Sequence, residues 1–297
     1  MRDVSVVIPT YERKAKVKRA VDSALDQTVR PKHIVIVDDG SSFDTAGFLN
    51  EEYETGIVDV VQHDHNQGAS QARNTGVDTV RTDYVAFLDS DDYWAPTKLE
   101  RQLERARETN AELIYCDQWI VDETGETKPS KKRLVEDDLW MALLSGWTAP
   151  NTSTLLFETE TFRDLGGFDT DLPSCQDHDL WMRAARENVI VAAVPERLAY
   201  FTQDADNRIS TDGRARLAGA RTFLNKWRND LIRTVGWRHY YWFRWQYVFR
   251  VALPVVRSNL SAGQPLPAVW VALSALAFNP VFYARAGRTL VNRARSG

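Results

Sequence analysis

Short apolar runs alternate with helical patterns through roughly the first 120 residues of the chain. Each run is rich in β-branched residues and ends at polar turn formers, which is typical of a buried strand. Between the runs, apolar residues such as Val17, Val21 and Leu25 recur at the spacing of an amphipathic helix. This alternation indicates βα units around a mostly parallel sheet. The predicted strands are Val4 to Ile8, Ile34 to Val37, Ile57 to Val61, Tyr84 to Leu88 and Ile114 to Cys116.

Beyond about residue 120 the alternation loosens. Val121 to Pro129 is rich in turn formers, whereas Trp140 to Trp147 and Asp177 to Arg186 carry helical patterns. We expect this stretch to form a second half-domain on the same sheet, so that residues 1–115 and 116–205 build one α/β domain. Residues 206–297 are predicted to form a mostly helical C-terminal region.

The two ends of the chain carry opposite charge. The net charge is −4, but the residues up to Asn207 include 39 acidic and 22 basic side chains, and those from Arg208 onward include 2 and 15. A basic segment of this density predicts contact with a polyanion, either a nucleic acid or an anionic membrane surface. With only Cys116 and Cys175, the composition indicates a reducing compartment and no disulfide framework. The N-terminus lacks a signal-peptide pattern, so we predict a cytoplasmic protein.

Aromatic residues and arginines are interleaved from Trp237 to Arg250, as in helices that lie at a membrane surface. The apolar run Leu266 to Phe278 is shorter than the ~20 residues needed to span a bilayer, which favours a surface-lying or re-entrant segment. The alternative is a helical extension packed against the α/β domain, with its aromatic residues as core. No nucleic-acid-binding module accompanies the charge, so the predicted partner is an anionic membrane and not a nucleic acid.

The carboxyl ends of the predicted strands carry polar clusters. In an open α/β sheet, ligands bind at these ends. One such cluster by itself has the composition of an ordinary turn, because Asp and Gly are common turn formers. Clusters after four successive strands indicate a binding site instead. They are Pro9-Thr10-Tyr11-Glu12, Asp38-Asp39-Gly40-Ser41, the loop Asn66 to Gly76 and Asp89-Ser90-Asp91-Asp92.

Asp89 and Asp91 flank Ser90 after the fourth strand and are candidates for a divalent-metal site. Mg²⁺ prefers oxygen ligands and keeps waters and substrate phosphates in its shell, so one or two carboxylates are enough. We predict that one of these carboxylates contacts a ribose and the other a Mg²⁺ or Mn²⁺ ion. Arg73, near the start of a predicted helix, is expected to face a diphosphate through its guanidinium group.

The motifs resemble those of family 2 glycosyltransferases with the GT-A fold, in the branch that builds oligosaccharides and polysaccharides. The resemblance covers roughly residues 3–205 and rests on Ser5-Val6-Val7-Ile8-Pro9-Thr10-Tyr11, Val37-Asp38-Asp39-Gly40-Ser41, Gly68 with Ala72-Arg73-Asn74-Thr75-Gly76, and Phe87-Leu88-Asp89-Ser90-Asp91-Asp92. It implies a Rossmann-like nucleotide-sugar-binding half, residues 1–115, and an acceptor half, residues 116–205, on a mixed central sheet. It further implies a metal at Asp91 and Asp89. The residues expected around the nucleotide sugar are Pro9, Thr10, Tyr11, Glu12, Asp38, Asp39, Arg73, Asp89, Ser90 and Arg208.

The segment Cys175 to Arg183 is similar to the family's Glu-Asp-x-Asp motif, whose first Asp usually serves as the catalytic base. By this match Asp177 is the predicted base, and Asp179 is predicted to assist it. Gln176 departs from the family's Glu. Taken without the resemblance, two Asp residues at a helix start are typical capping residues. His178, between the two acids, is interpreted as a bystander and not as a metal ligand.

The resemblance implies an inverting, metal-dependent glycosyltransferase. Its predicted donor is a UDP-, GDP- or dTDP-sugar, and its predicted acceptor is the hydroxyl of a lipid-linked or cell-surface glycan precursor at the inner membrane face. Two alternatives stay open: a polyprenyl-phosphate sugar synthase, and a catalytically silent scaffold that binds nucleotide sugars. A nucleotidyltransferase is disfavoured because the glycine-rich triphosphate loop that it needs after the first strand is absent from the sequence.

Overall fold

The computed structural model describes residues 2–53, 56–130, 134–145, 147, 149–203, 213–261, 263 and 269. The chain divides into two compact units. Unit 1 comprises Met1–Leu143, Trp147–Thr170 and Gln176–Asp204, and unit 2 comprises Leu144–Gly146, Asp171–Cys175 and Ala205–Gly297.

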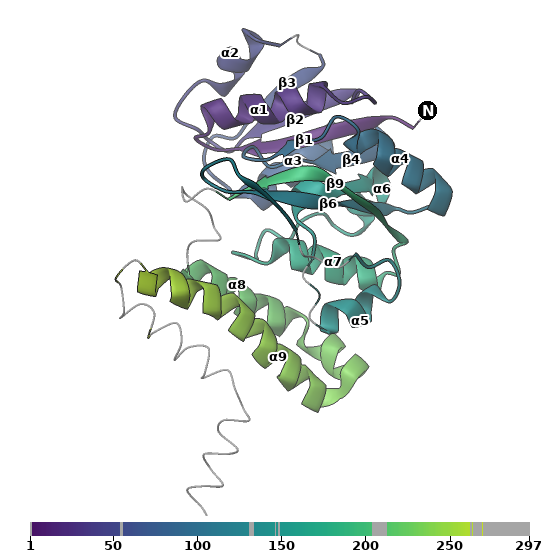
Figure 1. Cartoon of the computed structure of the whole chain (residues 1–297), viewed down its shortest axis with the longest axis vertical. Helices are drawn as coiled ribbons and strands as arrows, with labels where there is room; N and C mark the ends of the chain where they lie inside the picture. Colours follow the sequence, from purple (N-terminus) through teal and green to yellow (C-terminus); the bar gives the residue numbers. More distant parts are fainter. Residues whose placement is uncertain are drawn as a thin grey trace, which may run out of the picture. The chain divides into compact units, whose positions relative to one another are not determined.

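Unit 1 is built on a mixed nine-stranded sheet with the order β3-β2-β1-β4-β8-β6-β9-β5, and β7 pairs with β6 (Figure 1). The strands β1 to β4 run parallel to one another, and β8 joins them antiparallel. The strands are β1 Val4–Thr10, β2 His33–Asp38, β3 Val58–Gln62, β4 Tyr84–Phe87, β5 Tyr93–Trp94, β6 Leu113–Val121, β7 Thr127–Pro129, β8 Leu155–Glu158 and β9 Val191–Thr202.

The helices of unit 1 connect and cover these strands (Figure 1). They are α1 Lys14–Leu25, α2 Thr45–Asn50, α3 Ala69–Thr79, α4 Lys98–Thr109, the 3₁₀ turn η1 Thr152–Thr154, α6 Thr159–Asp164 and α7 Gln176–Arg186; α5 Leu139–Leu144 ends at the boundary with unit 2.

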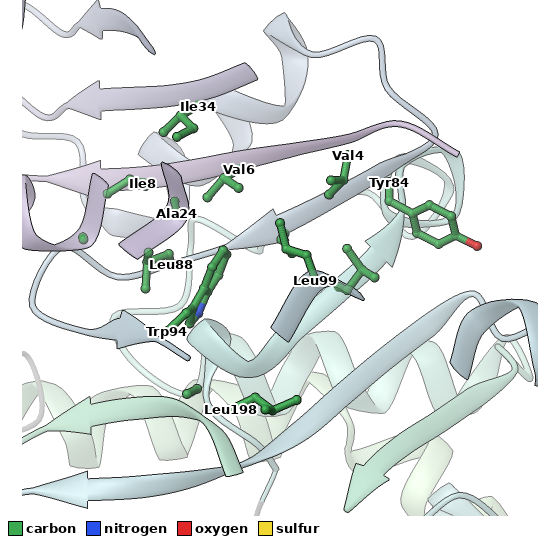
Figure 2. Close-up of a cluster of buried hydrophobic side chains, with 14 of the residues drawn as sticks. Val4, Val6, Ile8, Ala24, Ile34, Tyr84, Leu88, Trp94, Leu99 and Leu198 are labelled. Carbon is green, nitrogen blue, oxygen red and sulfur yellow. The ribbon is translucent and has the colours of Figure 1, made fainter. Parts of the chain in front are cut away.

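The two faces of the sheet are covered by different helices. Alternate strand residues such as Val6 and Ile34 join a buried cluster with the apolar residues of α1 and α4, among them Leu99 (Figure 2). On the other face, α3 approaches closely at Gly76, where a Cβ atom would lie 2.4 Å from Val7 Cγ1. Burying one such side chain contributes about 1.5–3 kcal/mol, and many of them are buried in this cluster. The core therefore holds the strands firmly, and with them the edge of the sheet from which the polar loops extend.

The fold confirms the predicted α/β class, although several boundaries differ from the prediction and the strands β5, β8 and β9 were not predicted. Strand β6 continues to Val121 instead of ending at Cys116, and β7 lies within the stretch predicted as turns. Strand β6 continues because it pairs along its length with β9, which is distant in the sequence, and this pairing leaves no mark in the local pattern. Strand β7 instead pairs with the end of β6 as a local hairpin across the turn 122–126.

Unit 2 contains the helices α8 Gly213–Lys226 and α9 Arg228–Ser261, and the left-handed conformation of Gly236 (φ 76°, ψ 161°) interrupts α9. The rings of Tyr247 and Phe223 stack at 5.1 Å, so α8 and the later part of α9 pack as a helical pair. Within the described ranges, no helix combines the length and the apolar character that a bilayer span requires. Arg208 and the apolar run 266–278, apart from Val269, lie outside the described residues.

Candidate active site

The loops after β1 and β2 are tied together by carboxylates. Asp38 is fully buried: its Oδ1 accepts hydrogen bonds from the amide and hydroxyl of Ser41 (3.0 and 2.6 Å), and its Oδ2 accepts one from Thr45 Oγ1 (2.7 Å). The carboxylate of Glu12 accepts from the amide and hydroxyl of Ser42 at 2.7 and 3.1 Å. Asp38, predicted from the sequence to bind nucleotide, therefore serves to shape its own turn.

The Asp39 carboxylate is hydrogen-bonded by His63 and by the loop that precedes α3. Its Oδ1 lies 2.8 Å from His63 Nδ1 and accepts the Gln67 amide at 2.9 Å, and its Oδ2 accepts the Gly68 amide at 2.8 Å. Gly40 makes this approach possible, because a Cβ atom there would lie 2.7 Å from the His65 carbonyl carbon. His63 was not among the site residues predicted from the sequence, although it directly follows β3 and so occupies a strand end.

The Asp89-Ser90-Asp91 loop is held by arginines. Arg73 pairs with Asp89, and Arg13 Nη1 lies 2.6 Å from Asp91 Oδ2. Arg19 donates to the backbone carbonyl of Asp91 at 2.5 Å. The structure thus joins the residues predicted as diphosphate and metal contacts into one charged cluster. Arg13 and Arg19 were not singled out from the sequence, although Arg13 immediately follows the first motif.

Asp92 and Ser153 hold the Asp89-Ser90-Asp91 loop in place through buried hydrogen bonds. Asp92 is fully buried; burial raises the pKa of its carboxyl well above the usual value, and the charges of Asp91 and Asp89 raise it further. Ser153 Oγ donates to Asp92 Oδ2 at 2.6 Å and accepts the Asp89 amide at 3.1 Å. The amide of Thr202 donates to Asp92 Oδ1 at 3.0 Å. These bonds fix the backbone from which Asp89 and Asp91 extend.

The turn Leu165–Phe168 connects the two halves of unit 1. Asn74 in α3 exchanges two 2.8 Å hydrogen bonds with the Phe168 backbone, and the Arg73 guanidinium lies 5.3 Å from the Phe168 ring centroid. At the other end of the turn, the carbonyl of Leu165 accepts a hydrogen bond from Arg183 in α7. The helix that carries the predicted base is therefore tied to the turn that also positions Arg73.

Asp177 and Asp179 occupy different environments in the first turn of α7. The Asp177 side chain is 33% exposed, and its Oδ1 accepts the His178 amide at 2.9 Å. Asp179 is fully buried and pairs with Arg183 Nε at 2.8 Å. Asp177 is therefore partly accessible to a substrate. Asp179 instead holds Arg183 within α7, so we assign Asp179 to the structure of the helix and not to proton transfer.

Within the described part of residues 1–115, Arg105 Nε in α4 and three atoms of the strand-end motifs are buried without a hydrogen-bond partner; the three are Thr10 Oγ1, Ser70 Oγ and Arg73 Nε. Thr10 ends β1, and the other two lie in the first half of α3. A buried polar group without a partner costs about 1–3 kcal/mol, so such a group calls for an explanation, and a polar ligand is one. Pro9 and Thr10 lie within β1, whereas Tyr11 is exposed.

The acidic residues also meet the requirements of a divalent cation. No cluster of three His, Cys, Asp or Glu side chains with metal-binding spacing occurs among the described residues. Mg²⁺, however, is usually held by one or two carboxylates together with the phosphates of a substrate. The side chains of Asp89 (29% exposed) and Asp91 (10% exposed) already hold positively charged guanidinium groups, so their donor chemistry fits the cation.

Residues 5–164 match the model of the family described as "Glycosyl transferase family 2". The chain is 28% identical over 216 residues to an uncharacterized glycosyltransferase of Haemophilus influenzae, which covers 70% of this chain and 71% of that protein. It is 34% identical over 120 residues to the UDP-Glc:alpha-D-GlcNAc-diphosphoundecaprenol beta-1,3-glucosyltransferase WfaP of Escherichia coli, or 40% of this chain and 47% of that one. The chain spans only 31% and 27% of the length of similar proteins of Rickettsia felis and Rickettsia bellii.

Among solved structures, TarS of S. aureus (residues 1–349, crystallised with UDP-GlcNAc) has a TM-score of 0.61 to this chain at 18% identity. The similarity covers 93% of this chain and 92% of that one, and it shows a shared GT-A fold. The chain belongs to glycosyl transferase family 2, since the family model matches more than half of its length.

Proposed function

We propose that the chain transfers a sugar from a nucleoside diphosphate-sugar to an acceptor hydroxyl in one inverting step. The observation that carries this proposal is the donor half of the site. Carboxylates and arginines meet there at the carboxyl edge of the sheet, together with buried polar atoms of Thr10, Ser70 and Arg73 that find no hydrogen-bond partner among the residues that the structure describes. A nucleotide with a diphosphate supplies polar groups and negative charge to such a surface.

The reaction requires a base on the acceptor side. The acceptor oxygen attacks the anomeric carbon, the bond from that carbon to the diphosphate oxygen breaks with its electron pair, and the hydroxyl proton passes to the Asp177 carboxylate. Arg73, which contacts the Phe168 ring and pairs with Asp89, would face the departing diphosphate. A Mg²⁺ or Mn²⁺ ion held by Asp91 and Asp89 would neutralise the charge that develops on the leaving group.

A lipid-linked glycan precursor is the acceptor that we favour. The printed name of WfaP describes transfer to a sugar on diphosphoundecaprenol, and that protein matches 40% of this chain. The alternative of a polyprenyl-phosphate sugar synthase would use the lipid phosphate itself, which needs no base. Because Asp177 is accessible at a helix start, we prefer a hydroxyl acceptor. The presence of Asp89, Asp91 and Asp177 together argues against a catalytically silent scaffold.

A lipid-linked acceptor is consistent with the exposed aromatic residues on the surface of α9. Trp242, Trp245 and Phe249 form a row on one side of this helix, with ring centroids 5.2 and 5.7 Å apart, and Trp242 is 55% exposed. Arg238 and Arg250 are exposed near the two ends of the row. Aromatic rings beside arginines suit the headgroup region of an anionic bilayer. We therefore propose peripheral association with the inner face of the cell membrane through this aromatic row.

The donor site is tested by Asp91→Asn in the full chain. We expect binding of UDP, GDP or dTDP to the wild-type protein to strengthen when Mg²⁺ or Mn²⁺ is added, because cation and diphosphate share one site. In Asp91→Asn this gain should fall about tenfold or more, measured by calorimetry with and without metal. Asp164→Asn, at the end of α6, is the matched control and should bind as the wild type does. Absence of nucleotide binding by the wild type would refute the proposed function.

The membrane contact is tested by cosedimentation with vesicles that contain phosphatidylglycerol. The double change Trp242→Ser with Phe249→Ser should weaken binding about tenfold or more, since it removes two rings from the proposed contact. Ile190→Ser is the matched control, because Ile190 is an exposed apolar residue (50%) of unit 1. Equal binding of the double variant and the wild type would mean that the aromatic row is not the contact.

A further inference from the structure

The Arg13 guanidinium group contacts the carboxylate that is proposed to hold the divalent cation. The inference drawn from this contact rests on the proposed function, because it concerns the cation and the diphosphate of the donor. Arg13 Nη1 lies 2.6 Å from Asp91 Oδ2, and the two side chains are 22% and 10% exposed. Solvent screens a partly buried pair less than a surface pair, so the positive charge of Arg13 acts strongly on this carboxylate.

The backbone is fixed on both sides of this ion pair. The Arg13 carbonyl accepts the amides of Lys16 and Val17 at 3.1 and 3.0 Å, the bonds that begin α1. On the other side, the Asp91 carbonyl accepts a hydrogen bond from Arg19 at 2.5 Å. The pair can therefore separate by rotation of the long Arg13 side chain, while the backbone stays in place.

The three arginines at this loop differ in how firmly their side chains are held. Arg19 donates to a backbone carbonyl and to Thr202 Oγ1 at 3.1 Å, and its guanidinium carbon lies 4.7 Å from the Tyr93 ring centroid. Arg73 likewise combines a carboxylate with an aromatic ring. Among the described residues, the Arg13 side chain makes one contact of these kinds, its ion pair. Arg13 is therefore the arginine that leaves its partner with the smallest loss.

Arg13 and a divalent cation compete for Asp91. Both are positively charged, and both take up lone pairs of the same carboxylate. Like charges within about 4–6 Å of each other repel. A cation at Asp91 must therefore displace the Arg13 guanidinium group or bind against its repulsion. In both cases Arg13 lowers the affinity of Asp91 for the cation alone.

A diphosphate relieves this competition. Its oxygens accept hydrogen bonds from a guanidinium group, and they are also ligands of Mg²⁺ and Mn²⁺. With a diphosphate bound, the Arg13 side chain exchanges one anionic partner for another, and Asp91 becomes available to the cation. The two ligands then strengthen the binding of each other, and the gain in affinity is the same in both directions.

We propose that Arg13 couples the binding of cation and donor: it competes with the divalent cation for Asp91, and it passes to the diphosphate when both ligands bind. The cation by itself then binds weakly, whereas the cation together with a nucleotide binds tightly. Arg13 has this effect through its charge, so a neutral side chain that donates a hydrogen bond to Asp91 cannot replace it.

The test measures the binding of Mn²⁺ to the full chain by electron paramagnetic resonance, without nucleotide and with saturating UDP, GDP or dTDP. Without nucleotide, Arg13→Met should bind Mn²⁺ about tenfold more tightly than the wild type, because a competing positive charge is removed. The factor by which nucleotide strengthens Mn²⁺ binding should be about tenfold smaller in Arg13→Met than in the wild type, within the usual range of coupling between two ligands.

Three further variants separate the charge of Arg13 from a structural role. Arg13→Lys keeps the charge and should behave as the wild type does. Arg13→Gln can still donate a hydrogen bond to Asp91 but is neutral, so it should bind Mn²⁺ as Arg13→Met does. Arg107→Met removes an exposed arginine from the last turn of α4 and is the matched control. It should leave Mn²⁺ binding unchanged with and without nucleotide.

The outcomes separate the coupling from the function beneath it. A wild type that binds none of the three nucleotides refutes the proposed function and the coupling together. If the wild type binds nucleotide but Arg13→Met binds Mn²⁺ alone no more tightly than the wild type, only the coupling is wrong. Wild-type behaviour of Arg13→Gln would also overturn it, because a hydrogen bond and not a charge would then be what matters. A variant that unfolds would lose affinity for Mn²⁺, which is the opposite of the expected gain.

Discussion

Replacing Asp177 with asparagine is expected to lower kcat for sugar transfer by about 10²–10⁴-fold, the usual contribution of a general base. Asparagine has the same shape, and its carbonyl oxygen can still accept the His178 amide that Asp177 Oδ1 accepts at 2.9 Å. The fold and donor binding should therefore be unchanged. The measurement is the transfer rate at saturating donor and acceptor, together with the dissociation constant of the donor nucleotide.

Glu160→Gln is the matched control for Asp177→Asn. Glu160 also lies in the first turn of a helix, and its side chain is 75% exposed. Its removal takes one negative charge from a helix N-terminus, which accounts for about 0.3–1 kcal/mol of stability and no loss of chemistry. If Asp177→Asn keeps more than about half of the wild-type rate, Asp177 is not the base.

Replacing Arg183 with methionine is expected to destabilise the protein by about 3–5 kcal/mol, because the buried Asp179 carboxylate would lose the guanidinium group that neutralises it. Asp179 is fully buried, and Arg183 Nε is 2.8 Å from its carboxylate. The variant also loses the hydrogen bond to the Leu165 carbonyl, which ties α7 to the turn before Phe168. The free energy of unfolding in urea measures the effect.

Arg186→Met provides the comparison on the same helix. Arg186 pairs with Glu187 at 2.9 Å, but both side chains are about half exposed, so this pair should contribute less than about 1 kcal/mol. The double change Asp179→Leu with Arg183→Met should recover part of the stability, since no buried charge is left unpaired. A loss in Arg183→Met no larger than in Arg186→Met would contradict the structural task that we assign to Asp179.

These two experiments separate neighbouring acids that are alike in the sequence. Asp177 and Asp179 stand two residues apart at one helix start, and the family motif includes both. Asp38 and Asp39 are adjacent, and both end the same strand. In the first pair Asp179 forms an ion pair within the fold, with Arg183. In the second pair both carboxylates are hydrogen-bonded within the protein, Asp38 in its own turn and Asp39 by His63 and two backbone amides. We assign Asp177 to proton transfer and Asp39 to the nucleotide.

The sequence by itself determined the parallel βα half of the fold and the edge of the sheet where polar loops gather. It could do so because strand and helix periodicities are local, and because the carboxyl ends of parallel strands lie at one edge whatever the remaining packing. It also identified Asp89, Asp91 and Arg73 as candidates through their order and spacing, and Asp177 through the resemblance of its segment to the family's motif.

Only the tertiary structure decided which of these residues meet and what holds them. Arg13 pairs with Asp91 across 78 positions, Ser153 accepts the amide of Asp89 across 64, and His63 reaches Asp39 across 24. Such contacts depend on the pairing of distant strands and on the close approach of α3, and a local pattern carries no record of either. The partner that a polar side chain finds, and so whether it shapes the fold or remains available to a ligand, is settled by packing.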